Sequence, residues 1–246
     1  MQNCACFRFY AELNDFLPSA KRKVDFTYYF QGTPSIKDAI EALGIPHTEV
    51  DLILINGKSV DFNYLLQNGD RVSVYPVFET LNITSATHLR TKPLRQTRFI
   101  LDVHLGRLAK YLRMLGFDTF YQNNYDDNAI IALSLKENRI ILTRDIGLLK
   151  NKVVTHGYWL RSTIPTKQLN EIINYFDLAA ELAPFKRCLV CNGELNPIAK
   201  ETIAAVLLPK TKAHFTEFYI CNHCSKIYWH GSHYNNMQKF LTHLLK

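Results

Sequence analysis

Two pairs of cysteines constrain the fold of this chain more than any other sequence feature. Each pair has the spacing CxxC, and 29 residues separate the two pairs, which are formed by Cys188 with Cys191 and by Cys221 with Cys224. Four thiolates with this kind of spacing are typical of a tetrahedral structural zinc site, in which no coordination position stays open for catalysis. We therefore expect a zinc ribbon over residues 186–246, with a long loop between the pairs.

Composition excludes several classes of protein. Hydrophobic residues make up 47% of the 246 residues and charged residues 21%, which is typical of a globular chain and not of a disordered one. No apolar run reaches the roughly 18 residues that a transmembrane helix needs, and the first six residues do not resemble a secretory signal. Since the cysteine pattern favours zinc in a reducing compartment over disulfides, we expect a cytoplasmic protein without a membrane partner.

Charge is distributed unevenly along the sequence. Residues 1–80 carry 7 Lys and Arg against 10 Asp and Glu, whereas residues 81–246 carry 22 against 12. Basic surfaces attract polyanions, of which nucleic acid is the commonest. We therefore expect the basic part to bind nucleic acid; the alternative is an ordinary solvated basic surface.

Residues 1–79 have the pattern of a small sheet with one helix. Ser35 is expected to cap that helix and Gly44 to end it, and the Asn56-Gly57 pair predicts a hairpin. Strand-like segments surround the helix at 7–10, 24–28, 52–55 and 71–76. Two strands, a helix and two more strands predict a β-grasp fold.

The second half of this module carries a resemblance. Residues 55–78, from Ile55-Asn56-Gly57-Lys58 onward, resemble the ubiquitin-like sulfur carriers of thiamine and molybdopterin synthesis. Those carriers act through a C-terminal Gly-Gly tail, whereas this chain continues through Glu79-Thr80-Leu81 into a further segment. We therefore expect a module that supports folding or recognises a protein partner, and not sulfur transfer.

Residues 98–185 alternate between strand and helix patterns and follow a polar segment at 80–97. We interpret the polar segment as a linker, with a basic arm that contacts phosphate as the alternative. Strands are expected at 98–102, 118–121 and 139–143, one or two more at 153–160, and helices at 105–115, after 126 and at 164–183. This alternation predicts a parallel α/β sheet flanked by helices.

Three aspartates are the candidate catalytic residues of this segment. Asp102 and Asp145 each follow an expected strand, and Asp127 begins the helix after the middle strand. Ligands of parallel sheets bind beyond the carboxyl ends of the strands, where clustered carboxylates predict Mg²⁺ or Mn²⁺ and phosphodiester hydrolysis. Each aspartate also has a structural interpretation, because Asp126 or Asp127 could cap a helix, Asp145 could serve a turn, and Asp102 could be another cap.

Several cations lie close to these aspartates in sequence. Arg107, Lys110 and Arg113 recur at every third position of the helix after Asp102, and Arg144 directly precedes Asp145. We expect these four residues to contact RNA phosphates, and a solvated polar face is an equally good interpretation of the helical stripe.

The same segments resemble a known family. The stretch 99–118, with Leu105-Gly106-Arg107-Leu108-Ala109-Lys110 at its centre, and the stretch 139–145 closely resemble the PIN-like ribonuclease domain named for the C-terminal region of mutator-type exonucleases. The resemblance extends over about 97–246 and implies that acidic residues bind metal and cut RNA, a role that it assigns to Asp102, Asp145 and, by its distance from the apolar Ile130-Ile131 pair, Asp127. Members that carry an N-terminal ubiquitin-like module would account for the whole chain.

An aromatic segment follows the second cysteine pair and also resembles the family. One interpretation is a lid over the zinc ribbon; the other has Tyr228 or Trp229 stacking on a base and His233 contacting phosphate. Together these patterns predict a metal-dependent ribonuclease with three parts: a ubiquitin-like β-grasp domain, a PIN-like α/β domain at 98–185 and a zinc ribbon. The rival prediction is a non-catalytic RNA-binding adaptor that uses the basic face and the ribbon.

Overall fold

The computed structural model describes residues 2–76 and 97–244, so the predicted linker lies, except for residue 97, outside the described residues. Contacts divide the chain into two compact units. The first unit combines Met1–Gln96 with Tyr125–Leu160, and the second combines Thr97–Asn124 with Arg161–Lys246. Each unit is described by itself. Among residues 2–76 and 97–244, none of the helices has the length and hydrophobicity of a membrane-spanning segment.

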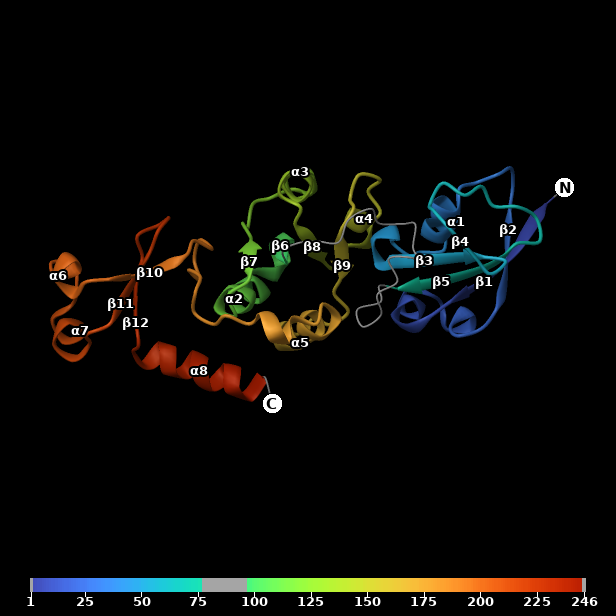
Figure 1. The fold of residues 1–246 in the computed structure, drawn as a ribbon. Helices are drawn as coiled ribbons and strands as arrows, with labels where there is room; N and C mark the ends of the chain where they lie inside the picture. Colours follow the sequence, from blue (N-terminus) through green and yellow to red (C-terminus); the bar gives the residue numbers. More distant parts are fainter. Residues whose placement is uncertain (1, 77–96, 245–246) are drawn as a thin grey trace. The chain divides into compact units, whose positions relative to one another are not determined.

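The N-terminal part of the first unit is a β-grasp domain (Figure 1). Its sheet has the order β2-β1-β5-β3-β4; β1 and β5 run parallel at its centre, and the other pairs are antiparallel. The elements are β1 (Asn3–Phe9), β2 (Phe26–Phe30), α1 (Ile36–Ala42), β3 (Val50–Ile55), β4 (Lys58–Val60) and β5 (Arg71–Pro76), with 3₁₀ turns at Ala11–Phe16, Ser19–Lys21 and His47–Glu49. The predicted ubiquitin-like fold is confirmed.

Local sequence signals explain the ends of these elements. The Ser35 hydroxyl accepts a hydrogen bond from the Asp38 amide (3.1 Å) and donates one to the Asp38 carboxylate (2.7 Å), which caps α1 as predicted. Asn56 and Gly57 have φ angles of 51° and 83° between β3 and β4. Positive φ at both central residues is the requirement of a type I′ hairpin, which is why the Asn-Gly pair predicts this turn.

The rest of the first unit comes from the α/β segment. It comprises α3 (Asp127–Glu137), β8 (Ile140–Thr143), α4 (Ile146–Leu149) and β9 (Gly157–Trp159). Strands β8 and β9 pair in parallel, and every residue of β8 is buried. A strand that is mostly apolar and buried at every position is typical of a parallel sheet. The sequence pattern predicts one or two strands at 153–160, and the structure has one there, β9.

The second unit contains a parallel strand–helix–strand motif. Strands β6 (Arg98–Leu101) and β7 (Asp118–Phe120) pair in parallel and are connected by a 3₁₀ turn (Val103–Leu105) and α2 (Gly106–Met114). The predicted apolar stripe of α2 is buried, with Leu108 and Leu112 fully enclosed. Parallel pairing in both units confirms the predicted parallel α/β sheet.

Helix α5 (Pro165–Tyr175) is shorter than the helix predicted at 164–183. The chain leaves the helix at Asp177, whose φ of 48° is left-handed, and continues as a 3₁₀ turn at Leu178–Glu181. Such a residue cannot continue a right-handed helix, and the apolar pattern does not record this single backbone angle.

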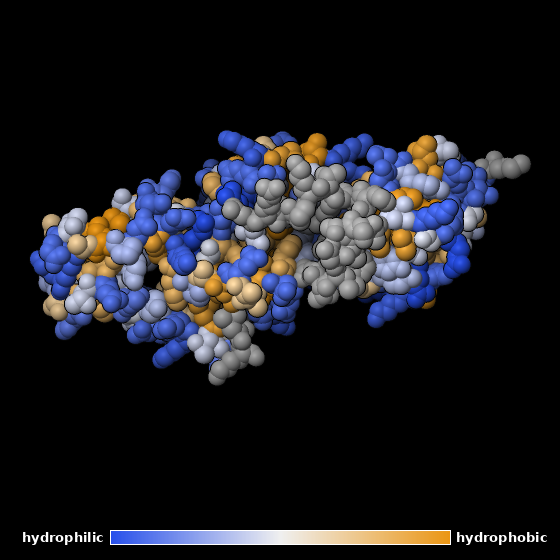
Figure 2. All heavy atoms as spheres, in the orientation of Figure 1, coloured by the Kyte–Doolittle hydropathy of each residue, from blue (hydrophilic) through white to orange (hydrophobic). Residues whose placement is uncertain are grey.

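The C-terminal part of the second unit contains a three-stranded antiparallel sheet of order β10-β11-β12. Its strands are β10 (Leu195–Ile198), β11 (Phe218–Cys221) and β12 (Ile227–Trp229), and its helices are α6 (Lys200–Ile203), α7 (Pro209–His214) and α8 (Ser232–Leu244). Helices α6 and α7 occupy the long loop predicted between the cysteine pairs. In Figure 2, this part of the chain, at the left of the view, shows hydrophobic atoms interspersed among hydrophilic ones.

Candidate functional site

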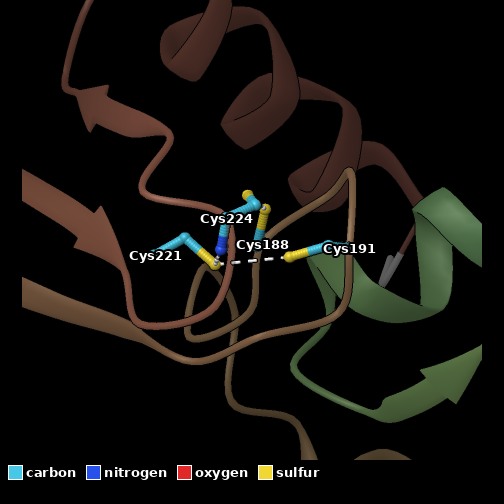
Figure 3. Close-up of side chains that lie close together, drawn as sticks. All are labelled: Cys188, Cys191, Cys221 and Cys224. Carbon is cyan, nitrogen blue, oxygen red and sulfur yellow. Dashed lines mark hydrogen bonds between the residues drawn. The ribbon is translucent and has the colours of Figure 1, made fainter.

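The four cysteines of the CxxC pairs converge at one point (Figure 3). Their sulfur atoms all lie within 4.8 Å of one another, with 3.6 Å between Cys188 and Cys224 and 3.3 Å between Cys191 and Cys221. Four sulfurs bound at about 2.3 Å to a tetrahedral zinc ion would lie roughly 3.8 Å apart. The donor set and its spacing therefore fit a structural Zn²⁺ site.

Neighbouring groups lower the pKa of one of these thiols, which favours the thiolate form that binds metal. The Tyr228 hydroxyl donates to the Cys188 sulfur (3.1 Å) and accepts from the Leu189 amide (3.2 Å). Burial raises the pKa of Cys188, but the hydrogen bonds from Tyr228 and from backbone amides outweigh it and lower that pKa to about 6. Burial and the neighbouring thiols instead raise the pKa of Cys191. Tyr228 thus supports the cysteine cluster, as the lid interpretation expects.

A buried arginine connects the cysteine cluster to the strand–helix–strand motif. Arg113 on α2 is 3% exposed, and its guanidinium donates to the carbonyls of Thr119 (2.9 Å), Val190 (2.9 Å) and Leu189 (3.3 Å). Because this side chain is enclosed and bonded to carbonyls, the prediction that Arg113 belongs to an exposed phosphate-binding stripe is corrected. Arg107 and Lys110 on the same helix are exposed.

A second connection involves two polar residues that the sequence did not single out as a pair. Asn192, 8% exposed, donates to the Asp118 carboxylate (2.7 Å) and accepts from the Thr119 amide (2.9 Å). Arg187 lies 3.8 Å from the same carboxylate. Asp118 therefore has a structural role at the start of β7.

The candidate catalytic aspartates occupy the predicted positions along the chain. Asp102 follows β6, and its side chain makes no capping hydrogen bond to the 3₁₀ turn that it precedes. Asp126 caps α3 through the Ala129 amide (2.7 Å), which leaves Asp127 as the exposed first residue of that helix. The capping role that the sequence left open between the two neighbours thus belongs to Asp126.

Asp145 combines an exposed position with a local structural bond. It follows β8, and its Oδ1 atom accepts from the Gly147 amide (2.7 Å), which caps the short helix α4. This bond uses one carboxylate oxygen. Asp127 and Asp145 belong to the first unit and Asp102 to the second, so the convergence of all three carboxylates stays a prediction.

The β-grasp domain contacts the segment that carries Asp145. Trp159 on β9 donates its indole N–H to the Arg144 carbonyl (3.1 Å), and its ring lies 4.9 Å from that of Phe16. The backbone amide of Trp159 donates to the fully buried carboxylate of Glu49 (2.5 Å). Arg144 itself is exposed next to Asp145, which is compatible with its predicted phosphate contact.

A buried histidine forms a second contact of the same kind. The two ring nitrogens of His47 lie 2.6 Å from the Glu41 carboxylate and 2.8 Å from the Val154 carbonyl. The histidine ring thus connects helix α1 to the loop that precedes β9. Sequence analysis missed Glu49 and His47 as connecting residues, because their partners lie more than 100 positions further along the chain.

The remaining predicted RNA contacts lie within the segment predicted as the zinc ribbon. Trp229 is 36% exposed at the end of β12, and its ring lies 6.4 Å from that of Phe215. His233 is exposed in the first turn of α8. Both residues are therefore accessible, and their contact with RNA stays a prediction.

Comparison with known proteins places the chain. Residues 97–241 match the family described as Mut7-C RNAse domain, and residues 2–82 match the family described as Mut7-C ubiquitin. No curated protein matches the chain. Among solved structures, the chain is similar to H. volcanii small archaeal modifier protein 1, with 16% identity, a TM-score of 0.26, and coverage of 31% of this chain and 99% of that one. Because the first match spans more than half of the sequence, the chain belongs to the Mut7-C RNAse domain family and carries that family's ubiquitin-like module at its N-terminus.

Proposed function

We propose that this protein is a metal-dependent ribonuclease that hydrolyses RNA phosphodiester bonds, in RNA processing or decay in the cytoplasm. The observation that carries the proposal is membership of the Mut7-C RNAse domain family, combined with acidic residues at the ends of parallel strands. Asp102, Asp127 and Asp145 are the proposed ligands of Mg²⁺ or Mn²⁺. Such an ion, when bound, supplies an activated water and stabilises the departing oxygen.

The protein's own residues have separable roles in this proposal. Exposed Arg107, Lys110 and Arg144 attract and position the phosphate backbone, because cationic side chains replace condensed counterions. The zinc site has four protein ligands, so it stabilises the ribbon and takes no part in cleavage. The ubiquitin-like domain supports the β8–β9 segment and is the proposed contact for a protein partner.

The test compares an aspartate that is proposed to bind metal with one that only caps a helix. Asp145→Asn keeps a side-chain oxygen for the Gly147 amide but removes a charge, so cleavage of single-stranded RNA in Mg²⁺ or Mn²⁺ should fall by at least roughly 100-fold with little change in RNA affinity. Asp126→Asn is the matched control, since it also keeps a helix cap and removes an exposed carboxylate.

The second candidate function is the non-catalytic RNA-binding adaptor. Its support is the capping bond of Asp145, which gives this residue a structural purpose without chemistry. If Asp102→Asn and Asp145→Asn both cut RNA at the rate of the unaltered protein, or if the unaltered protein does not cut, the ribonuclease proposal fails and the adaptor remains.

A further inference from the structure

A pocket of about 350 Å³ lies on the second unit. Its walls come from the segment that leads into the first CxxC pair, from the ribbon sheet and from helix α8. Aromatic side chains line much of it, namely Phe185, Tyr219, Tyr228, Trp229 and Tyr234. Sites for small ligands span roughly 300–1,000 Å³, so this pocket lies at the small end of that range.

The aromatic rings form a continuous row along this pocket. The Tyr234 ring lies 4.5 Å from Phe185 and 4.1 Å from His230, and His230 lies 5.7 Å from Tyr219. Packing of the rings on one another fixes their orientation, so little side-chain freedom is lost when a flat ligand binds. Trp229 contributes a partly exposed indole to the lining.

Positive charge lies at the same pocket. Lys186 and Arg187 belong to its lining. The Arg187 guanidinium donates to the carbonyls of Gly116 (3.3 Å) and Asn192 (3.0 Å), whereas Lys186 is exposed, so a phosphate in solvent can reach its ammonium group. Flat π-surfaces beside a cation match the two parts of a nucleotide, its base and its phosphate. An aliphatic ligand would need neither the flat π-surfaces nor the cation.

We propose that this pocket takes one unstacked base of single-stranded RNA, while Lys186 contacts a neighbouring phosphate. The proposal rests on the proposed ribonuclease function for the identity of the ligand. It adds a site that holds the RNA strand by its base and that tolerates any base, because every base has a π-face.

The test compares RNA with a backbone that lacks bases. The probes are a labelled 12-nucleotide oligouridine and an abasic ribose-phosphate oligomer of the same length, titrated against the full chain without divalent metal. Stacking of one base predicts a Kd roughly five- to 100-fold lower for oligouridine. Oligouridine should also quench tryptophan emission; Trp229→Phe should lose this quenching, with the other of the chain's two tryptophans as internal reference.

Pocket variants make the comparison specific. Tyr234→Leu should weaken oligouridine binding at least roughly fivefold and leave abasic binding unchanged. Tyr29→Leu is the control, because this tyrosine is 60% exposed on β2, in the first unit. Zinc content and the melting temperature of Tyr234→Leu show whether the ribbon is folded; if it is not, Tyr234→Phe, which keeps the ring, should bind as the unaltered protein does.

Each outcome bears on one proposal. Equal affinity for oligouridine and the abasic oligomer, or undiminished quenching in Trp229→Phe, overturns the base pocket even when Asp145→Asn abolishes cleavage. A clear preference for oligouridine that Tyr234→Leu removes supports the pocket even if Asp145→Asn cuts normally, a result that would remove only the ribonuclease proposal.

Discussion

The β-grasp domain and the zinc ribbon are stabilised in different ways. The β-grasp core is a cluster of 16 buried hydrophobic residues in which Phe7, Ile40 and Ile53 are fully enclosed. In the ribbon, by contrast, Ile203, Phe218 and Leu241 are the large hydrophobic residues that are buried among those described, besides two cysteines. A core of that size contributes little hydrophobic free energy, so we expect the ribbon to depend on zinc bound by its four cysteines and on its polar connections.

Zinc removal should give the largest difference between the two regions. Zinc binding contributes about 10–16 kcal/mol of folding free energy in small zinc domains. We therefore expect a chelator, or Cys191→Ser, to unfold the ribbon while the β-grasp domain keeps its melting transition. Proteolysis with mass mapping and NMR spectra would locate the loss, and elemental analysis should give one zinc per chain.

The control for this experiment is Cys4→Ser, since Cys4 lies on β1 of the first unit and is not one of the four clustered cysteines. It should leave the zinc content unchanged. Freshly purified, reduced protein that contains no zinc would contradict the expectation that the ribbon needs zinc to fold.

The hydrophobic side is tested by Phe7→Ala. Phe7 is fully buried, with its ring 5.9 Å from Phe9 and 5.4 Å from Tyr28. Truncation of such a side chain costs about 3–5 kcal/mol of unfolding free energy. Denaturant unfolding should show this loss in the β-grasp transition, with zinc content unchanged; the exposed-site variant Tyr29→Ala should shift it by no more than about 0.5 kcal/mol.

The polar connection of the ribbon is tested on one helix. Arg113→Met keeps much of the side-chain volume but leaves the buried Thr119 carbonyl and the partly buried Val190 carbonyl without their donor. We expect a loss of about 1–3 kcal/mol from the second unit. Arg107→Met, on the exposed face of the same helix, should be nearly neutral for stability; equal losses would show that burial of Arg113 is not the cause.

Helix geometry explains why the sequence misplaced Arg113. Positions spaced by three advance 300° around a helix of 3.6 residues per turn, so Arg113 lies about 120° from Arg107. A three-residue spacing thus drifts off the polar face and toward the apolar one within two steps. The stripe looks continuous in the sequence, and only its first two members are exposed in the structure.

Local sequence patterns predicted those features of the fold that are determined by residues close together in the sequence. The Ser35 cap, the Asn56-Gly57 turn and the CxxC spacing each specify geometry within a few residues. Contacts such as Glu49 with Trp159 join positions 110 residues apart, and no local pattern encodes them. The candidate aspartates fall between these cases: their places at the ends of strands or at the start of a helix were predictable, and their mutual distances were not.

Protons should weaken zinc binding in a graded way. At pH 7, Cys188, with a pKa lowered to about 6, is mostly thiolate, while Cys191, with a raised pKa, carries a proton that zinc must displace. Below about pH 6, Cys188 also becomes protonated. Zinc affinity should therefore fall as pH falls, and more steeply below pH 6, by one further tenfold step per pH unit, or about 1.4 kcal/mol.

Competition with a chelator of known affinity at several pH values would measure this slope. Tyr228→Phe removes the hydroxyl that donates to Cys188, which should raise the pKa of this thiol. The steeper fall of zinc affinity should therefore begin at a higher pH in this variant. An identical pH profile for this variant would show that Tyr228 does not tune the cysteine.

The smallest expected effect belongs to the exposed cations of α2. Arg107→Gln and Lys110→Gln should each weaken binding of single-stranded RNA only a few-fold, because each removes about one phosphate contact and lowers the slope of log K against log salt by roughly 0.7. Arg113→Gln should leave that slope unchanged, since its guanidinium already binds protein carbonyls. Fluorescence anisotropy at several salt concentrations measures both quantities. If Arg113→Gln changes the salt slope while the second unit stays folded, the buried arginine reaches RNA after all, and the division between connecting and RNA-binding residues on this helix fails.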